Sequence, residues 1–160
     1  MEILHLLEKL TQNCGVAGYE NQSLTFWKMN KGYRSGAPYT AWQPDLHRKQ
    51  ESPDKPHVVL EAHMDEIGLM VCDIDDRGFL KVTRCGGIDR RVATASPVII
   101  HGKNGDRRGI VASEEQNPAK NPTLEQLYVD AGVSREQAEK EFPIGTRISY
   151  IGSFKHLLEG

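Results

Sequence analysis

Hydrophobic residues recur with two different periods along this chain. Between residues 2 and 13, leucine and isoleucine recur at three- and four-residue spacing, and charged or amide side chains occupy the other positions. This spacing predicts an amphipathic helix, which Gly15 ends. From residue 69 onward the apolar runs are short and alternate with polar residues, which predicts a series of β-strands.

Turn residues divide the second half of the chain into its elements. Asp75–Gly78 predicts the turn of a hairpin between strands 69–74 and 79–84. The aspartates at 73, 75 and 76 could also suggest a calcium-binding loop, but no glutamate follows at the spacing that such a loop requires. The other predicted elements are strands 97–101 and 108–112 around Asn104–Gly105, strands 127–130 and 146–151, and a helix over 134–141. Ser134 is the expected N-cap of that helix and Gln137 its capping-box partner. Short strands in this number predict a compact β-barrel or sandwich.

A buried strand is also predicted just before residue 63. Val58–Leu60 is apolar and follows Pro56, and the polar residues His63 and Asp65 come at its end, where a parallel α/β sheet binds ligands. Two residues apart on an extended backbone, these side chains point to the same side. A carboxylate beside an imidazole fixes its tautomer for metal binding. The alternative is a hydrogen-bonded strand-end histidine and an aspartate that caps a turn or helix.

Composition excludes several classes of function. Of 160 residues, 26% are charged and the net charge is −2, so no electrostatic bias toward nucleic acid or membrane is expected. No apolar run could span a bilayer, and no signal peptide is recognisable at the N-terminus. Cys14, Cys72 and Cys85 are odd in number and lack metal-site spacing, which predicts free thiols in the cytoplasm.

The string Val58–Val71, Val-Val-Leu-Glu-Ala-His-Met-Asp-Glu-Ile-Gly-Leu-Met-Val, resembles the first metal-ligand segment of the tetrahedral aminopeptidases. These are dinuclear metallo-aminopeptidases that include glutamyl and deblocking aminopeptidases, and some members carry the name endoglucanase. The resemblance continues through residues 78–82, 85–92, 98–105, 127–132 and 143–146, roughly two thirds of the chain.

The resemblance implies a fold and a domain division. Residues 1–68 would be an α/β fragment of a zinc-peptidase-type catalytic domain, and residues 69–152 the small all-β, barrel-like domain inserted into it, with residues 153–160 as a tail. In the family this barrel covers the active site and contributes to assembly of dimers into hollow dodecamers, so self-association is expected. Residues 69–152 should form the protease-resistant core. Residues 1–60 should expose apolar surface or pack on the β-domain in a way that the family does not.

The resemblance also implies the chemistry. Such enzymes release N-terminal residues from peptides with two divalent metals, zinc or cobalt. His63 would be a metal ligand, and Asp65 the catalytic carboxylate that orients a metal-bound imidazole. Glu66 and Gly68 match the motif without a separate role.

The family's other ligands follow the barrel, and Ser153–Gly160 matches none of them. We therefore expect a truncated chain that retains no metal and is inactive as a peptidase. The alternative is a non-catalytic assembly or binding module that uses the β-domain. A glycoside hydrolase would need a carboxylate pair, which the sequence does not provide. Glu114–Glu115 is expected to lie in a charged loop over 113–121, and His57, His101 and His156 are expected on the surface.

Residues 24–52 depart from the family. Glycine and proline are frequent there, no period is sustained, and the family's Leu-Gly-Asn-Leu-Ile strand is absent. A one-base shift in a possible coding sequence for Ala41–Leu46 restores that string. Two hypotheses stay open: residues 24–52 are read out of frame, with the frame restored before Pro56, or they form a divergent surface loop.

Overall fold

A computed structural model describes residues 3–20, 34–35, 46–47, 63, 65–115, 117 and 120–155. Its helices are α1 (Ile3–Gln12), α3 (Arg90–Ala93), the 3₁₀ helix η1 (Leu124–Gln126) and α4 (Arg135–Glu141). Its strands are β1 (Arg34–Ser35), β2 (Leu46–His47), β3 (Gly68–Ile74), β4 (Leu80–Cys85), β5 (Pro97–Gly102), β6 (Gly105–Ser113), β7 (Leu127–Asp130) and β8 (Arg147–Tyr150).

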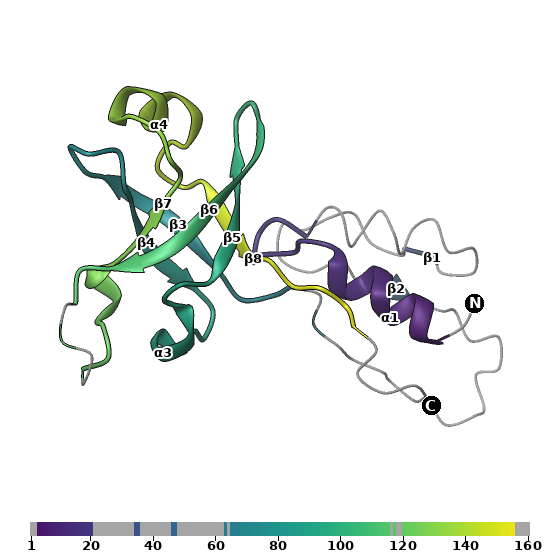
Figure 1. Cartoon of the computed structure of the whole chain (residues 1–160). Helices are drawn as coiled ribbons and strands as arrows, with labels where there is room; N and C mark the ends of the chain where they lie inside the picture. Colours follow the sequence, from purple (N-terminus) through teal and green to yellow (C-terminus); the bar gives the residue numbers. More distant parts are fainter. Residues whose placement is uncertain are drawn as a thin grey trace, which may run out of the picture.

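Six strands close into an antiparallel barrel in the order β3-β4-β7-β6-β5-β8 (Figure 1). Pairing of β3 with β8 joins the first strand to the last, with Leu69 opposite Ile148. Closure leaves the sheet without a free edge. Of the two architectures predicted from the strand pattern, the barrel is therefore confirmed.

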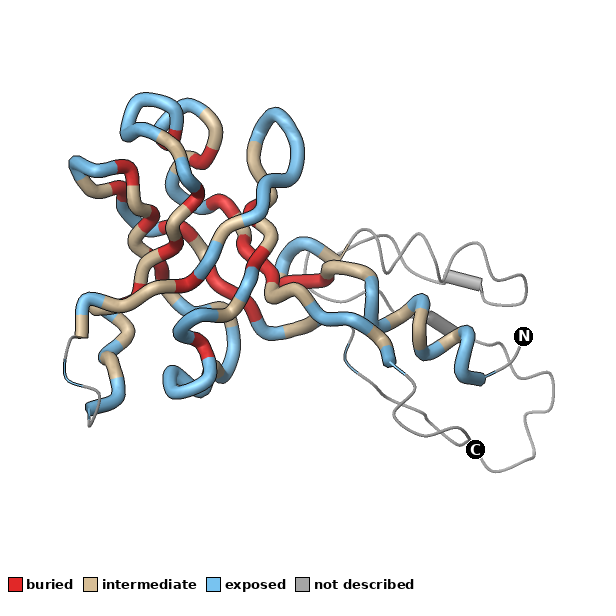
Figure 2. The backbone as a smooth tube through the Cα atoms, viewed as in Figure 1, coloured by how far each residue is buried: buried red, intermediate tan, exposed pale blue. Residues whose placement is uncertain are grey.

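The barrel interior is a continuous apolar core, shown as the red segments in Figure 2. Buried and more exposed residues alternate in β4, β5 and β7, as the period of two requires. Leu69, Leu80, Ile100, Leu127 and Ile148 are all fully buried. Phe142, which follows α4 and is also fully buried, belongs to the same core.

Two hairpin turns have the predicted chemistry. In the β3–β4 turn, Asp75 Oδ1 accepts hydrogen bonds from the backbone N–H groups of Arg77 and Phe79, and Gly78 has a φ of 91°. In the β5–β6 turn, Gly102 pairs with Gly105 and Gly105 has a φ of 113°. Both glycines adopt a conformation that side chains disfavour. The predicted hairpins are confirmed.

The helix predicted over 2–13 is present as α1, and it lies apart from the barrel (Figure 1). None of its residues is buried, and Ile3, Leu4 and Leu7 are 75%, 52% and 43% exposed. The apolar exposure expected for the N-terminal part of the chain is confirmed for this helix. No helix in the described residues has the length and hydrophobicity to cross a membrane.

Several predictions lie outside the described residues. These are the strand before residue 63, His57, His156, and the segment 24–52 apart from β1 and β2, which pair antiparallel.

Within the described residues, the helix with Ser134 as N-cap and Gln137 in the capping box is confirmed as α4. The short helices α3 and η1 were not predicted. Their only sequence signals are caps, Asp89 and Thr123, since three or four residues show no period.

Candidate functional site

His63 and Asp65 lie together, as their spacing predicts. His63 Nδ1 lies 2.9 Å from the backbone oxygen of Asp65 and 3.2 Å from its Oδ1. Because both partners are acceptors, the imidazole proton must be on Nδ1, and the lone pair of Nε2 is left available. The His63 side chain is 85% exposed, so Nε2 is accessible to a ligand. The pair therefore has the tautomer that a metal-bound imidazole needs.

A complete metal centre needs more than this pair. Zinc is held by three or four protein ligands, and a dinuclear centre requires additional bridging groups. Within the part of the chain that the structure describes, no three His, Cys, Asp or Glu side chains cluster closely enough to hold an ion. The described residues therefore fit one position of such a centre and not the whole set.

Glu66 connects this pair to the N-terminal segment. Its N–H donates to the Gly15 oxygen at 2.8 Å, and its Oε1 accepts from the Gly15 N–H at 2.9 Å. Val16 and Glu66 also form an isolated parallel bridge. Glu66 immediately follows Asp65, so these bonds hold the residues of the candidate pair against the turn that follows α1. The sequence alone did not indicate this role for Glu66.

Gly68 allows that turn to dock on the barrel. Val16 is 1% exposed and packs directly over Gly68. A Cβ at residue 68 would lie 2.6 Å from Val16 Cγ2 and 2.6 Å from the carbonyl oxygen of Ile148. Only glycine permits this approach without a shift of the backbone. We call residues 14–20, with the barrel residues that they contact, the joint.

His101 belongs to the joint, which corrects the expectation that it lies on the surface. Its side chain is only 11% exposed, and the ring of Tyr19 stacks on it at 6.3 Å between centroids. Its Nδ1 lies 2.9 Å from Asp106 Oδ1, and its Nε2 lies 2.9 Å from Ser149 Oγ. The N-terminal turn covers a position that would otherwise be the outer edge of a hairpin, and no local pattern reveals this.

Two further polar contacts complete the joint. Ser149 is fully buried, and its hydroxyl donates to Cys14 Sγ at 3.3 Å. Arg147 Nε donates to the carbonyl oxygen of Ala17 at 3.4 Å. The joint is thus held by apolar packing, by the ring stack between Tyr19 and His101, and by hydrogen bonds from β8 and Glu66.

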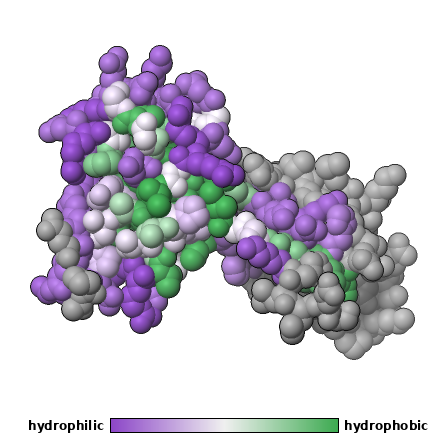
Figure 3. Space-filling view, viewed as in Figure 1, coloured by the Kyte–Doolittle hydropathy of each residue, from purple (hydrophilic) through white to green (hydrophobic). Residues whose placement is uncertain are grey.

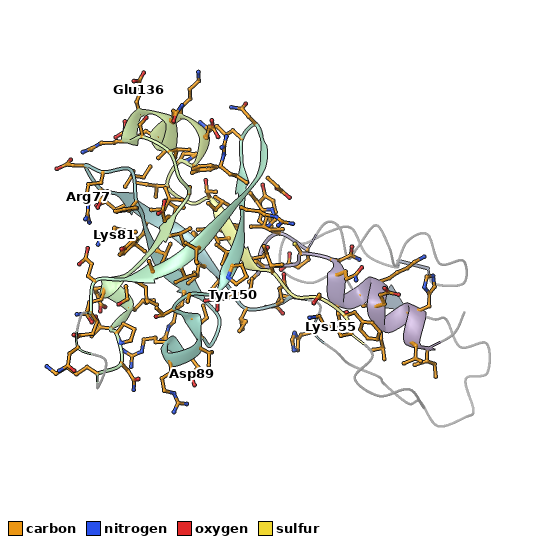
Figure 4. All side chains as sticks on the ribbon, in the orientation of Figure 1. Arg77, Lys81, Asp89, Glu136, Tyr150 and Lys155 are labelled. Carbon is orange, nitrogen blue, oxygen red and sulfur yellow. The ribbon has the colours of Figure 1, made fainter. Side chains whose placement is uncertain are left out.

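A cavity of about 280 Å³ opens at this joint. Its lining includes Cys14, Glu66, Ile99 and Tyr150. Tyr150 lies at the end of β8 on the side of α1 (Figure 4). Its hydroxyl is buried and has no hydrogen-bond partner in the described part of the chain, and burial raises its pKa.

Glu114 lies in the 113–121 loop at the barrel surface. Glu114 is exposed and its Oε1 lies 2.5 Å from Lys81 Nζ, an ion pair at the barrel surface. Surface ion pairs of this kind contribute little to stability. For Glu114 this confirms the expectation of a charged loop.

Several known proteins that are similar to this chain are aminopeptidases. A putative aminopeptidase of Acetivibrio thermocellus is 38% identical over 96 residues, which is 59% of this chain and 28% of the relative. The aminopeptidase APDkam598 of the archaeon Desulfurococcus kamchatkensis superposes with a TM-score of 0.81 and 26% identity, covering 96% of this chain and 44% of the other. PhTET1-12s, described as a dodecamer, superposes at 0.78 with 25% identity, covering 98% and 48%.

This chain therefore spans less than half the length of each of these proteins. The family model of the M42 glutamyl aminopeptidases matches residues 46–160, which include the His63–Asp65 pair and the whole barrel. The match covers more than half of the chain and agrees with the superposed folds. The chain belongs to the M42 glutamyl aminopeptidase family.

Proposed function

We propose that this chain supplies the N-terminal part of a metal-dependent aminopeptidase that releases N-terminal amino acids from peptides. Family membership supports the reaction class. The observation that carries the proposal is the hydrogen bond from His63 Nδ1 to Asp65, which directs the Nε2 lone pair of an exposed imidazole outward. His63 would ligate a zinc or cobalt ion, and Asp65 would fix the imidazole tautomer.

By this proposal the chain alone does not hydrolyse peptides. One imidazole cannot hold an ion against solvent, and the other ligands would come from residues with no counterpart among those described. Residues 1–68 would belong to an α/β catalytic domain, and residues 69–152 would be the barrel inserted into it. The free thiols of Cys14, Cys72 and Cys85 suit a cytoplasmic protein.

A chimaera tests the role of the pair. Residues 63–152 of this chain would replace the aligned segment of the Acetivibrio thermocellus putative aminopeptidase. We expect cobalt-dependent hydrolysis of aminoacyl anilides, a loss of at least about a hundredfold in H63A, and a loss of about 10- to 100-fold in D65N. The matched control is D76N, which changes an aspartate that is 95% exposed on a hairpin turn.

Two results would contradict the proposal. One is an active chimaera in which H63A retains both its cobalt and its rate. The other is cobalt-dependent hydrolysis by the unmodified chain alone, because the chain would then hold a complete centre.

The second candidate function is a non-catalytic assembly module. The barrel buries its own core, yet Val92, Ile110 and Ile144 are 70%, 46% and 71% exposed on it. Figure 3 shows hydrophobic atoms gathered on the visible face of the barrel. The similar fold of PhTET1-12s, described as a dodecamer, supports self-association. Light scattering of the purified chain tests this candidate: a stable assembly that I144E dissociates supports self-association through the barrel, and a monomer argues against the module.

A further inference from the structure

Four side chains form a continuous hydrogen-bonded chain across the joint, which we call the relay. It runs from Asp106 to His101, then to Ser149 and to the thiol of Cys14, with steps of 2.9, 2.9 and 3.3 Å. The members come from β5, β6, β8 and the turn after α1. The proposed peptidase chemistry uses none of them. The relay links a carboxylate and an imidazole to a nucleophilic sulfur.

We propose that Cys14 is a thiol–disulfide exchange site, and that the relay is the base that activates it. Asp106 accepts from Nδ1–H of His101, so Nε2 of the neutral ring can accept a proton. The buried hydroxyl of Ser149 lies between Nε2 and Sγ and carries one proton. When that proton points to Sγ the hydroxyl donates to Cys14, and when it rotates to Nε2 the hydroxyl accepts from the Cys14 S–H. The thiol of Cys14 thereby has a route for its proton to the imidazole.

In the exchange step the disulfide reagent is the oxidant, and no other redox partner is needed. As the Cys14 proton moves to Ser149, the Ser149 proton moves to His101 Nε2, and the resulting thiolate attacks one sulfur of a small disulfide. A bond forms between Sγ and that sulfur, and the disulfide bond of the reagent breaks. The released thiolate takes up the proton that Cys14 lost. Cys14 is oxidised to a mixed disulfide, and the departing half of the reagent is reduced.

The surroundings of Cys14 favour small reagents without negative charge. Cys14 is partly exposed and lines the cavity at the joint, which gives a reagent access to it. Glu66 lines the same cavity, so a cationic disulfide such as cystamine is the suitable probe. The contacts of the thiol also predict how its modification affects the fold. A substituent on Sγ disrupts the bond from Ser149 and weakens the docking of residues 14–20.

Cys72 provides an internal comparison. It is exposed on β3, but burial of its thiol and the neighbouring carboxylate of Asp73 raise its pKa. A raised pKa lowers the thiolate fraction at neutral pH, and the thiolate is the nucleophile. If exposure alone controlled reactivity, Cys72 would react faster than Cys14. If the relay controls it, Cys14 reacts first.

The experiment treats the full chain with cystamine at neutral pH and follows each cysteine by peptide mass after acid quenching. We expect Cys14 to react at least about tenfold faster than Cys72. In S149A and H101Q the Cys14 rate should fall about tenfold, because the proton route to the imidazole is broken, and the Cys72 rate should stay unchanged. H5Q, which changes an exposed histidine of α1, is the matched control and should leave both rates unchanged.

D106N keeps the test decisive if substitution of the buried residues unfolds the barrel. Asp106 is 57% exposed, so its replacement leaves the packing intact, and the Cys72 rate reports the fold of β3. We expect D106N to slow Cys14 by about fivefold, because the charge that stabilises the imidazolium is removed. The proposal is overturned if Cys72 reacts as fast as Cys14 in the unmodified chain, or if D106N changes the Cys14 rate by less than about twofold.

Discussion

The barrel and the N-terminal helix use their apolar residues in opposite ways. In the barrel, Leu69 and Ile148 are fully buried within a sheet that has no free edge. In α1, Ile3 and Leu4 lie on a clear apolar face and yet are 75% and 52% exposed. A barrel closes on itself, whereas a single helix needs a second surface to cover its apolar face. An amphipathic pattern thus predicts which residues form an apolar face, but whether that face is buried depends on the tertiary fold.

The sharpest test of this comparison replaces one leucine in each region. Leu69→Ala should lower the free energy of unfolding by about 2–5 kcal/mol, because it leaves a cavity in a closely packed core. Leu4→Ala should change it by less than about 0.5 kcal/mol, since the side chain is already exposed. Urea denaturation followed by circular dichroism measures both. Equal losses would mean that α1 is packed as firmly as the barrel, and the contrast would be wrong.

The next test separates the two regions at the joint. Gly68→Ala places a Cβ where Val16 and the Ile148 carbonyl oxygen lie at 2.6 Å, so the turn after α1 must move away. We expect faster hydrogen exchange of the Val16–Tyr19 segment and a loss of about 1–3 kcal/mol in the unfolding free energy.

Gly152→Ala is the matched control, because a Cβ at that position meets nothing within 4 Å. It should leave both exchange and stability unchanged. Unaltered exchange at residues 16–19 in Gly68→Ala would show that the joint does not depend on the close approach at Gly68.

Most of the barrel could be predicted because its signals are local. In β4, β5 and β7 one face is buried, which produces alternation, and the turns carry residues suited to their backbone, such as Gly78 and Gly105. The pairing of His63 with Asp65 is equally local, since it spans two residues. For these features, neighbours along the chain are also neighbours in space.

The joint could not be predicted, because its contacts are distant in sequence. Ser149 contacts Cys14 across 135 residues, and Arg147 contacts Ala17 across 130. The ring that covers His101 belongs to Tyr19, which is distant in sequence. The sequence therefore led to the wrong expectation that His101 lies on the surface. A histidine at a hairpin edge carries no local sign of whether another segment will dock on it.

The smallest expected effect concerns a polar feature on the outer surface of the barrel. Asp89 caps α3 by accepting from the Arg91 N–H, and the side-chain hydrogen bond from the Arg91 guanidinium lowers the pKa of this carboxyl from 3.8 to about 2. A carboxyl with a lowered folded-state pKa stabilises the fold above its unfolded pKa and loses that contribution as pH falls through the folded value.

Asn can also cap a helix, so Asp89→Asn removes the charge and keeps the cap. We expect the variant to be slightly less stable than the unmodified chain above pH 4, and the difference to vanish toward pH 2. Because both residues are exposed, solvent screens the pair and the difference should be far smaller than that of Leu69→Ala. Thermal unfolding between pH 2 and pH 7 measures it. A constant offset across this range would show that the Asp89 charge makes no contribution to the stability of the barrel.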